Sequence, residues 1–341
     1  MKSAVFYGKH DLRIENHEIP AIGPEDVLIQ VKACGVCGTD VHIFEGDKGA
    51  ADVTPPTILG HEFSGVVVQT GSAVTACKAG DRVCVDPNRP CGCCTACRSG
   101  INHFCTHMTG YGTTVDGGFA EYCAVDQRQV YLLGQNTSFA QGAMAEPVAC
   151  CLHGIDLCEI QPGSNVAVIG GGMIGLLMVQ LARLAGAAKV ALIEPVESKR
   201  AVGKRLGADV CIDPACTDVS AALAAAGMDW LHTVIECVGR PETMAQAVAL
   251  AGRKAVVMLF GLTKPDETIS VQPFTLFQKE LTLKASYINP YTQKRALDLI
   301  DTGRLDVESM VCDVCALEQL PEILHSPALR ARGKYIISPE K

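Results

Sequence analysis

Hydrophobic positions change their spacing at about residue 150 of this chain. Before that point, short runs rich in valine and isoleucine alternate with glycine and proline, as around Val27–Val31 and Val66–Val68. Short β-branched runs bounded by turn residues are typical of β-strands. Residues 1–145 are therefore predicted to be rich in β-structure.

After residue 150, apolar runs of strand length alternate with segments of helical spacing. The predicted strands are Asn165–Ile169, Lys189–Ile193, Val210–Ile212, His232–Ile235, Ala255–Phe260, Leu281–Ala285 and, near the end of the chain, Tyr335–Ile337. The predicted helices are Ile174–Ala185, Lys199–Leu206, Pro241–Ala251 and Gln293–Asp301. Strands that alternate with helices form a parallel, doubly wound sheet, so the predicted fold class is α/β.

Length and charge narrow the possible functions. The 341 residues suggest two domains, and the share of hydrophobic residues, 48%, is enough for sizeable cores. The net charge of −8 and the lack of any run of five basic residues argue against nucleic-acid or anionic-membrane partners. The longest apolar stretch, Val166–Leu181, contains four glycines and is shorter than the roughly 20 residues of a membrane span. We expect a cytoplasmic protein with mostly reduced thiols.

Five of the eighteen cysteines lie within RPCGCCTACRSGINHFC. Four of them have the spacing C-x2-C-x2-C-x7-C, and these are Cys91, Cys94, Cys97 and Cys105. Such spacings let thiolates converge on one tetrahedral zinc ion, while an iron–sulfur cluster or inert thiols are the alternatives. Cys93 is expected to point away from the ion. Four thiolates leave no open coordination position, so the reaction is expected elsewhere.

A glycine-rich turn follows the first predicted strand of the doubly wound sheet. Gly170, Gly172 and Gly175 form the pattern G-x-G-x-x-G, and the second strand ends at Glu194, 19 residues after Gly175. The glycines let a pyrophosphate approach the helix N-terminus, and the acidic side chain can accept hydrogen bonds from the ribose hydroxyls. That charge repels a 2′-phosphate, so the pattern predicts NAD rather than NADP. A packing turn without nucleotide, or an FAD site, is the alternative.

Two further motifs, CGVCGTDVH and GHE, carry a second set of groups that could bind a metal. They contain Cys37, Thr39, Asp40, His42, His61 and Glu62. Taken singly, a cysteine beside glycines is most often a packing residue, and a His–Glu pair is most often at the surface. Their occurrence together with a nucleotide pattern and a cysteine quartet favours a reactive metal site.

GHE, the cysteine quartet, GGFAEY at Gly117–Tyr122, the glycine turn and the closing GKYIISP together resemble the zinc-dependent medium-chain alcohol dehydrogenase family. The resemblance covers essentially the whole chain, and MAEPVACC is similar to the polyol branch that includes sorbitol dehydrogenases. It implies a β-rich GroES-like catalytic domain at residues 1–145 and 286–341, and a Rossmann domain that binds NAD at residues 146–285. A homotetramer or homodimer is expected by the same analogy.

The resemblance implies a catalytic zinc held by Cys37 and His61. Glu62 would be a direct ligand or lie close enough to exchange with water. Asp40 is a candidate to orient His61, since a ligating imidazole usually donates its other N–H to an acceptor.

Further roles follow from the same resemblance. Glu146 would hold the zinc-bound water or the substrate, with Cys150 and Cys151 as alternatives at the metal. Thr39 and His42 match the proton relay of the family, in which the Thr39 hydroxyl takes the alcohol proton and His42 delivers it to solvent.

Cofactor and substrate contacts complete the comparison with the family. Positions that match residues around the pyrophosphate, the adenosine ribose and the nicotinamide are Ile174, Lys199, Phe260, Gly261 and Leu262. Ile43, Ser286 and Tyr287 stand where sorbitol dehydrogenases carry an aromatic residue, an arginine and a tyrosine. Losing the arginine removes five hydrogen-bond donors, so sorbitol itself is not the expected substrate.

The predicted function is zinc-dependent hydride transfer between a secondary alcohol, a polyol or sugar alcohol, and NAD. Zinc with an open position lowers the pKa of a bound alcohol, which prepares its carbon to release hydride. L-Threonine, butanediol or sugar (aldose) dehydrogenase activity on the same scaffold is the alternative. A non-catalytic nucleotide-binding module is the remote alternative, and it predicts loss of the reactive metal ligands, which this sequence retains.

Overall fold

The computed structural model describes residues 1–47 and 53–341, which form two compact units. Unit 1 comprises Met1–Ala149 and Asn289–Lys341, and unit 2 comprises Cys150–Ile288. The sequence-based division at residues 145 and 285 differs from these limits by a few residues. Helix α4 (Ala145–Cys158) continues through the first limit, so no turn residue marks it in the sequence.

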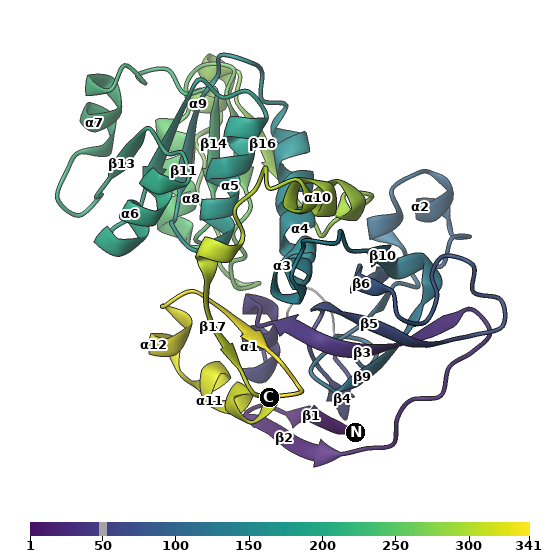
Figure 1. The fold of residues 1–341 in the computed structure, drawn as a ribbon. Coiled ribbons are helices and arrows are strands. Elements are labelled where there is room, and N and C mark those ends of the chain that lie inside the picture. Colours follow the sequence, from purple (N-terminus) through teal and green to yellow (C-terminus); the bar gives the residue numbers. More distant parts are fainter. Residues whose placement is uncertain (48–52) are drawn as a thin grey trace. The chain divides into compact units, whose positions relative to one another are not determined.

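Unit 1 is rich in β-structure, as predicted (Figure 1). Its seven-stranded sheet contains β3 (Asp26–Gly35), β5 (Glu62–Thr70), β6 (Arg82–Val85), β9 (Tyr122–Asp126), β10 (Val130–Leu132), β17 (Val311–Cys315) and β18 (Lys334–Ile337). Smaller sheets contain β1 (Lys2–Gly8), β2 (Asp11–Asn16) and β4 (Thr57–Ile58), and β7 (Asn88–Arg89) with β8 (Thr109–Gly110). The helices of this unit, besides part of α4, are α1 (Gly38–Phe44), α2 (Thr95–Arg98), α3 (Phe139–Ala143), α10 (Gln293–Asp301), α11 (Leu320–His325) and α12 (Pro327–Arg330).

Strand pairing in unit 1 brings three distant segments together. β3 pairs with β5 so that Gly35 lies opposite Glu62, and β18 pairs with β3 so that Ile336 also lies opposite Gly35. Large buried side chains, including Phe44, Phe63 and Phe119, fill the core beneath these strands. The end of β3, the start of β5 and the start of β18 therefore meet at one place in the sheet.

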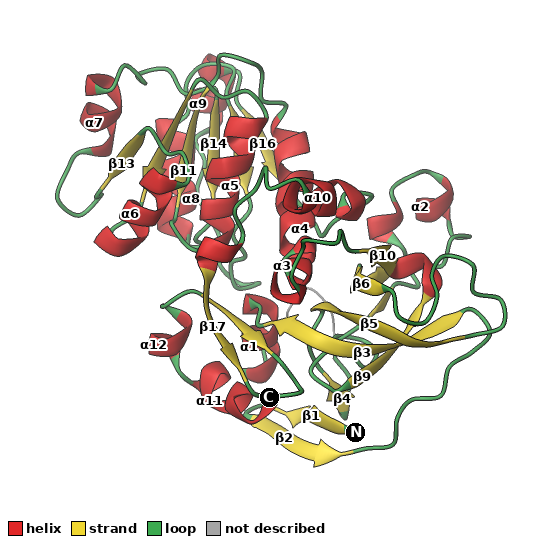
Figure 2. Cartoon of the chain, in the orientation of Figure 1, coloured by secondary structure: helices red, strands yellow, loops and turns green. Residues whose placement is uncertain are grey.

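Unit 2 is a six-stranded parallel sheet with strand order β13-β12-β11-β14-β15-β16 (Figure 2). Its strands are β11 (Asn165–Ile169), β12 (Lys189–Ile193), β13 (Val210–Ile212), β14 (Thr233–Glu236), β15 (Val256–Leu259) and β16 (Thr282–Ala285). Its own helices are α5 (Met173–Leu184), α6 (Glu197–Arg205), α7 (Val219–Ala225), α8 (Pro241–Leu250) and α9 (Pro273–Lys279). The prediction of a doubly wound α/β fold of the Rossmann type is confirmed.

Both faces of this sheet are buried, which explains why its strands are continuous apolar runs rather than alternating ones. Ala167 and Ile169 of β11 belong to the core that includes residues of α7 and α8. Val168, which alternates with these two residues in β11, lies close to Gly175 of α5. Leu192 of the neighbouring strand β12 lies close to Gly203 of α6. A Cβ at Gly203 would stand 2.2 Å from Leu192, so this glycine lets α6 pack closely on the sheet.

The predicted elements agree closely with the observed ones where apolar runs are long. Asn165–Ile169, Lys189–Ile193, Val210–Ile212 and Gln293–Asp301 have the predicted bounds, and the other predicted elements differ by one or two residues at an end. Helices α7 and α9 were not predicted, because each has only seven residues and so short a segment shows little helical periodicity. Among residues 1–47 and 53–341, no helix has both the length and the hydropathy needed to cross a membrane.

A buried carboxyl group joins two parts of unit 1. Asp86 lies between β6 and β7, and its Oδ1 accepts hydrogen bonds from the Asn88 N–H, 3.0 Å away, and from the Asn289 side-chain amide, 3.1 Å away. Burial raises the pKa of Asp86 from 3.8 to about 6. Two donors thus do not fully replace the water that the carboxylate loses on folding.

We predict that Asp86 makes the stability of the protein fall as pH rises from 4 to 7. The folded state binds this proton more tightly than the unfolded state does. Its stabilising contribution is therefore complete below pH 4 and is lost as pH passes through about 6, by up to about 3 kcal/mol. Urea unfolding of wild type and Asp86→Asn at several pH values measures this, and the variant's relative stability should increase with pH.

Asp81→Asn is the matched control. The Lys78 backbone N–H and side chain lower the pKa of Asp81, so removing this carboxyl should change the pH dependence in the opposite direction. A stability difference between Asp86→Asn and wild type that stays constant from pH 4 to 7 would contradict the assignment.

Candidate metal centres and cofactor site

The structure brings the sulfur atoms of the predicted quartet within 4.8 Å of one another. Cys94 precedes α2, Cys97 lies within that helix, and a 3-10 turn at Asn102–Phe104 leads to Cys105. The Sγ–Sγ distances are 3.5 Å for Cys94–Cys97 and 3.8 Å for Cys94–Cys105. These distances are much longer than the roughly 2.05 Å of a disulfide bond and suit ligands that converge on one ion.

Hydrogen bonds, burial and the close approach of the sulfur atoms change the pKa values of thiols in this quartet. The Cys97 backbone N–H is the main cause that lowers the pKa of Cys94 to about 6. Burial and the neighbouring Cys94 sulfur raise the pKa of Cys97 to about 12. A cation would relieve the repulsion between thiolates, so the donor set fits zinc. Cys93 is exposed and outside the group, with its Sγ 3.7 Å from that of Cys91.

Cys37, His61 and Glu62 form the second group of possible ligands within 4.8 Å of one another. Cys37 lies just beyond β3, at the N-terminus of α1, and Glu62 is the first residue of β5. One thiolate, one imidazole and one carboxylate are ordinary zinc ligands. Because a tetrahedral ion takes four ligands, this group leaves one position for water or substrate.

Asp40 holds both Cys37 and His61 in place. Its Oδ2 accepts a hydrogen bond from the Cys37 backbone N–H at 2.8 Å, and its Oδ1 is 3.4 Å from Nδ1 of His61. Burial alone lowers the pKa of His61, but the charges of Asp40 and Cys37 raise it well above its usual value. Asp40 is fully buried, so its charge acts without screening by solvent.

Lys334 forms a buried ion pair with Glu62, and sequence reasoning missed it. Burial lowers the pKa of Lys334, yet Glu62 and Cys37 outweigh it and the net pKa is raised. The pair fits only because residue 35 is glycine: a Cβ there would stand 2.1 Å from Glu62 Oε2 and 2.8 Å from Lys334 Cε. The signal in the sequence is a lysine at the start of the apolar strand KYII.

The GGFAEY segment supports the GHE motif from behind. The Gly118 and Phe119 N–H groups donate to the carbonyl oxygens of Gly60 and Leu59, at 2.7 and 3.0 Å. Gly60 has φ +93°, and a Cβ there would stand 2.7 Å from the Phe119 ring. The two motifs therefore form one packed unit that fixes the backbone before His61.

The other predicted catalytic residues are not part of the group formed by Cys37, His61 and Glu62. Thr39 and His42 lie three residues apart on α1, and His42 Nδ1 is 3.5 Å from Asp47 Oδ2. Glu146 is buried in the first turn of α4 but is not part of the ligand group formed by the described residues. Cys150 and Cys151 follow in the same helix and are also outside it.

The glycine turn has the geometry that the fingerprint predicts. Gly170 has φ +100°, and a Cβ at Gly175 would stand 1.8 Å from the Gly170 carbonyl oxygen. Gly172 caps the N-terminus of α5, whose first backbone N–H groups can face an anion. Ile174 lies in the first turn of this helix.

Glu194, at the carboxyl end of β12, is buried and bonded to the turn. Its carboxylate accepts hydrogen bonds from the Gly171 N–H at 2.6 Å and from the Val196 N–H at 2.9 Å. Arg200 of α6 donates to the Glu194 carbonyl oxygen at 2.8 Å and was not predicted, whereas Lys199, the predicted residue, precedes it in that helix.

The remaining predicted contact residues are distributed over both units. Phe260, Gly261 and Leu262 follow β15, and Leu262 is 58% exposed. Ile43 is buried in the core of unit 1, whereas Ser286 and Tyr287 belong to unit 2.

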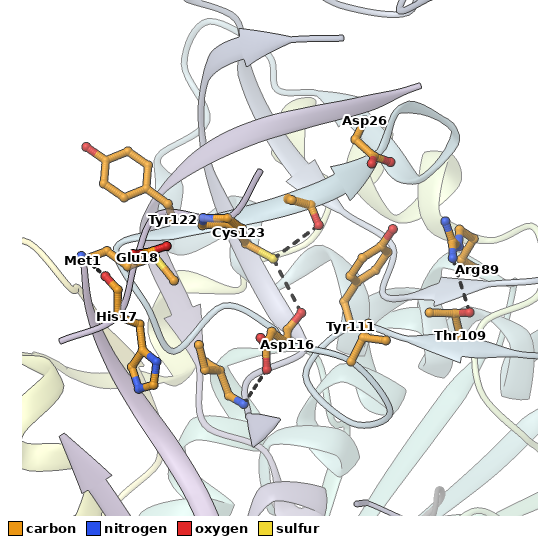
Figure 3. A pocket seen from close by; sticks show the side chains of 14 residues that line it. Met1, His17, Glu18, Asp26, Arg89, Thr109, Tyr111, Asp116, Tyr122 and Cys123 are labelled. Atoms are coloured by element: carbon orange, nitrogen blue, oxygen red, sulfur yellow. Dashed lines mark hydrogen bonds between the residues drawn. The ribbon is translucent and has the colours of Figure 1, made fainter. Parts of the chain in front are cut away.

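Unit 1 also contains a cavity of about 600 Å³ that holds none of the predicted site residues (Figure 3). Its lining includes Tyr111, Arg89 and Asp116, and the Asp116 carboxylate accepts a hydrogen bond from the Ile58 N–H at 2.9 Å. The lining thus carries side chains of both charges.

Comparisons with known proteins agree with this arrangement. A model described as "Alcohol dehydrogenase GroES-like domain" matches residues 23–135, and one described as "Zinc-binding dehydrogenase" matches residues 173–302. D-arabinitol dehydrogenase 1 of Uromyces fabae is 31% identical over 99% of this chain and 97% of its own length. L-threonine 3-dehydrogenase of Caldanaerobacter subterraneus is 33% identical over 85% of each chain.

Among solved structures, a putative zinc-binding dehydrogenase from Sinorhizobium meliloti 1021, bound to NADP, is 39% identical, with a TM-score of 0.95 over 99% of both chains. Two domains of this kind, with a cysteine quartet and a Cys–His–Glu group, define a zinc-dependent dehydrogenase. The chain belongs to the zinc-dependent medium-chain alcohol dehydrogenase family, in its polyol branch, and is an oxidoreductase.

Replacing Lys334 by methionine is predicted to destabilise the zinc-stripped protein by about 3–5 kcal/mol, because it leaves the Glu62 charge buried and unpaired. Denaturant unfolding measures the loss. The double variant Lys334→Met with Glu62→Gln should recover most of it, since both charges are then gone.

Lys254→Met is the matched control, because Lys254 and Glu280 form an exposed pair at 3.5 Å. Its loss should be below about 1 kcal/mol. Equal losses for Lys334→Met and Lys254→Met, or a double variant as unstable as Lys334→Met alone, would contradict this account of the pair.

Proposed function

We propose that this protein oxidises a secondary alcohol group of a polyol or sugar alcohol to a ketone with NAD, and catalyses the reverse reduction. The observation that carries the proposal is the group of three ligands, Cys37, His61 and Glu62, beside buried charges that orient them. When bound, zinc supplies Lewis acidity toward the alcohol oxygen and NAD supplies the hydride acceptor.

Two zinc ions per chain are part of this proposal. Cys91, Cys94, Cys97 and Cys105 would hold a closed, structural ion, because four thiolates complete its coordination. The three-ligand group would hold the reactive ion. Glu146 would bind the water or substrate at the fourth position, and Asp40 would keep the imidazole of His61 oriented.

The proton would leave through α1. Thr39 would accept the alcohol proton at its hydroxyl while releasing its own hydroxyl proton toward the ribose of a bound cofactor, and His42 would pass a proton on to solvent. The partial exposure of the His42 side chain supports this order, because its ring is within reach of solvent.

For the cofactor, we propose that NAD binds at the glycine turn formed by Gly170, Gly172 and Gly175. Ile174 would flank the pyrophosphate, Lys199 the adenosine ribose, and residues 260–262 the nicotinamide. Glu194 keeps a buried negative charge at the end of β12, which disfavours a 2′-phosphate. The NADP in the Sinorhizobium relative makes both cofactors necessary in any assay.

For the substrate, Ile43, Ser286 and Tyr287 would form the contacts beyond the metal. They include no guanidinium, so an uncharged polyol fits better than a phosphorylated one. L-Threonine is the second candidate, favoured by the L-threonine 3-dehydrogenase relative. We assign catalysis to residues 1–145 and 286–341, and NAD binding to residues 146–285.

We further propose that the protein forms a homodimer or homotetramer through β16. Within the described residues β16 pairs only with β15, so one backbone edge can accept a second copy. Phe274 and Phe277, in α9 shortly before it, are 63% and 78% exposed. Static light scattering tests this proposal, and a monomeric mass would contradict it.

Eighteen free thiols support a cytoplasmic location, and a disulfide in protein isolated from its host would contradict it.

A panel of pentitols, hexitols, butanediol, aldoses and L-threonine with NAD and NADP tests the proposed function. The expected result is reduction of NAD by a polyol, which is measured as an increase in the absorbance of NADH. Turnover of L-threonine alone would favour the second candidate, and no turnover of any alcohol would contradict both.

Cys37→Ser is predicted to lower turnover of the best substrate by more than about 1000-fold, because the reactive zinc loses a ligand and its several kcal/mol of transition-state stabilisation. NADH affinity should stay within about twofold, since Cys37 lies in unit 1. Cys216→Ser, which changes an exposed thiol outside both metal groups, is the control. Retained turnover in Cys37→Ser would overturn the assignment of this site.

A further inference from the structure

Glu236, the last residue of β14, is fully buried and is not among the predicted site residues. Its Oε1 accepts three hydrogen bonds, from the Val238 N–H at 2.7 Å, the Gly239 N–H at 2.9 Å and the Thr243 hydroxyl at 2.8 Å. Hydrogen bonds to a carboxylate are about twice as strong as those between neutral groups. One carboxylate oxygen thus fixes the loop after β14 to the start of α8.

The backbone of the same residue fixes a second loop. The Glu236 carbonyl oxygen accepts hydrogen bonds from the N–H groups of Phe260, at 3.0 Å, and Gly261, at 2.9 Å, just beyond β15. Residues 237–239 and 260–262 are therefore both attached to one residue.

The two loops also contact each other directly. A Cβ at Gly261 would stand 2.2 Å from the Gly239 nitrogen, and a Cβ at Gly239 would stand 2.4 Å from the Leu262 carbonyl oxygen. The glycines let the loops interlock, so a shift in one is passed to the other. Within the described residues, Glu236 Oε2 is buried without a hydrogen-bond partner, so this carboxylate is held through Oε1 alone.

The position of these loops in the sheet indicates what they do. The strand order reverses between β11 and β14, and a dinucleotide binds at the carboxyl ends of strands on both sides of such a point. The glycine turn and Glu194 occupy the half formed by β11–β13. Residues 237–239 and 260–262 occupy the same edge of the half formed by β14–β16.

We propose that Glu236 is a positioning residue for the nicotinamide half of the cofactor, acting through the backbone of these two loops. This inference rests on the proposed function, because it takes NAD as the ligand of unit 2. It gives the two carboxylates different roles: Glu194 organises the adenosine half and Glu236 the nicotinamide half.

Two ligands that differ in the nicotinamide half test the proposal. Isothermal titration of NADH and ADP-ribose is done with wild type and Glu236→Ala, both as full-length zinc-loaded protein. The expected result is NADH binding weakened by at least about tenfold in Glu236→Ala, with ADP-ribose binding within about twofold. Glu242→Ala, which removes an exposed glutamate in the first turn of α8, should leave both affinities unchanged.

If Glu236→Ala fails to fold, Glu236→Gln tests the same proposal, because the carbonyl oxygen of the glutamine side chain can still accept the three hydrogen bonds. Loss of the charge weakens those bonds, and NADH binding alone should weaken, by about threefold. Equal weakening of NADH and ADP-ribose would overturn the proposal by making Glu236 a general structural residue, and unchanged NADH binding would also overturn it. A wild type that binds neither ligand would instead overturn the proposed function.

Discussion

The buried charges around Glu62 are the constraint on which the metal site depends. Glu62, Lys334 and Asp40 are all buried, and each charge is compensated by a partner from another segment. Burying an ion costs several kcal/mol unless it is paired, so the sheet must bring the ends of β3, β5 and β18 together. Gly35 makes this possible, because any side chain there would collide with the pair. The orientation of the metal ligands thus depends on one arrangement of buried charges.

Unit 2 also contains buried carboxylates with compensated charges, but hydrogen bonds rather than a cation compensate them. At the ends of β12 and β14, Glu194 and Glu236 are buried, and backbone N–H groups compensate their charge. A carboxylate at the end of a parallel strand can fix the following loop without a cation. The cysteine quartet differs from both, because its four thiols converge in a loop with little regular structure, where the proposed zinc ion would hold them together.

Features that depend on a local sequence pattern could be predicted from the sequence. Parallel strands such as Asn165–Ile169 were predicted to the residue because continuous apolar runs leave little choice, and the quartet was found because its spacing is local. Lys334 could not be predicted as the partner of Glu62, since strand pairing brings together residues more than 270 positions apart. Ile43, which a resemblance places near the substrate, packs in the core of unit 1, and its contact with the substrate stays a prediction. The role of Glu236 is likewise invisible in the sequence, because its contacts are with backbone groups.

Two zinc sites of different composition are the central claim, and X-ray absorption at the zinc edge, with total zinc measured on the same sample, tests it most directly. The account predicts two zinc ions per chain that share five sulfur ligands, four at the quartet and one from Cys37, with nitrogen and oxygen completing the second ion. In Cys37→Ser, the remaining signal should be that of an ion bound by four sulfurs. One zinc per chain in the wild type, or an all-sulfur environment for both ions, would contradict the account.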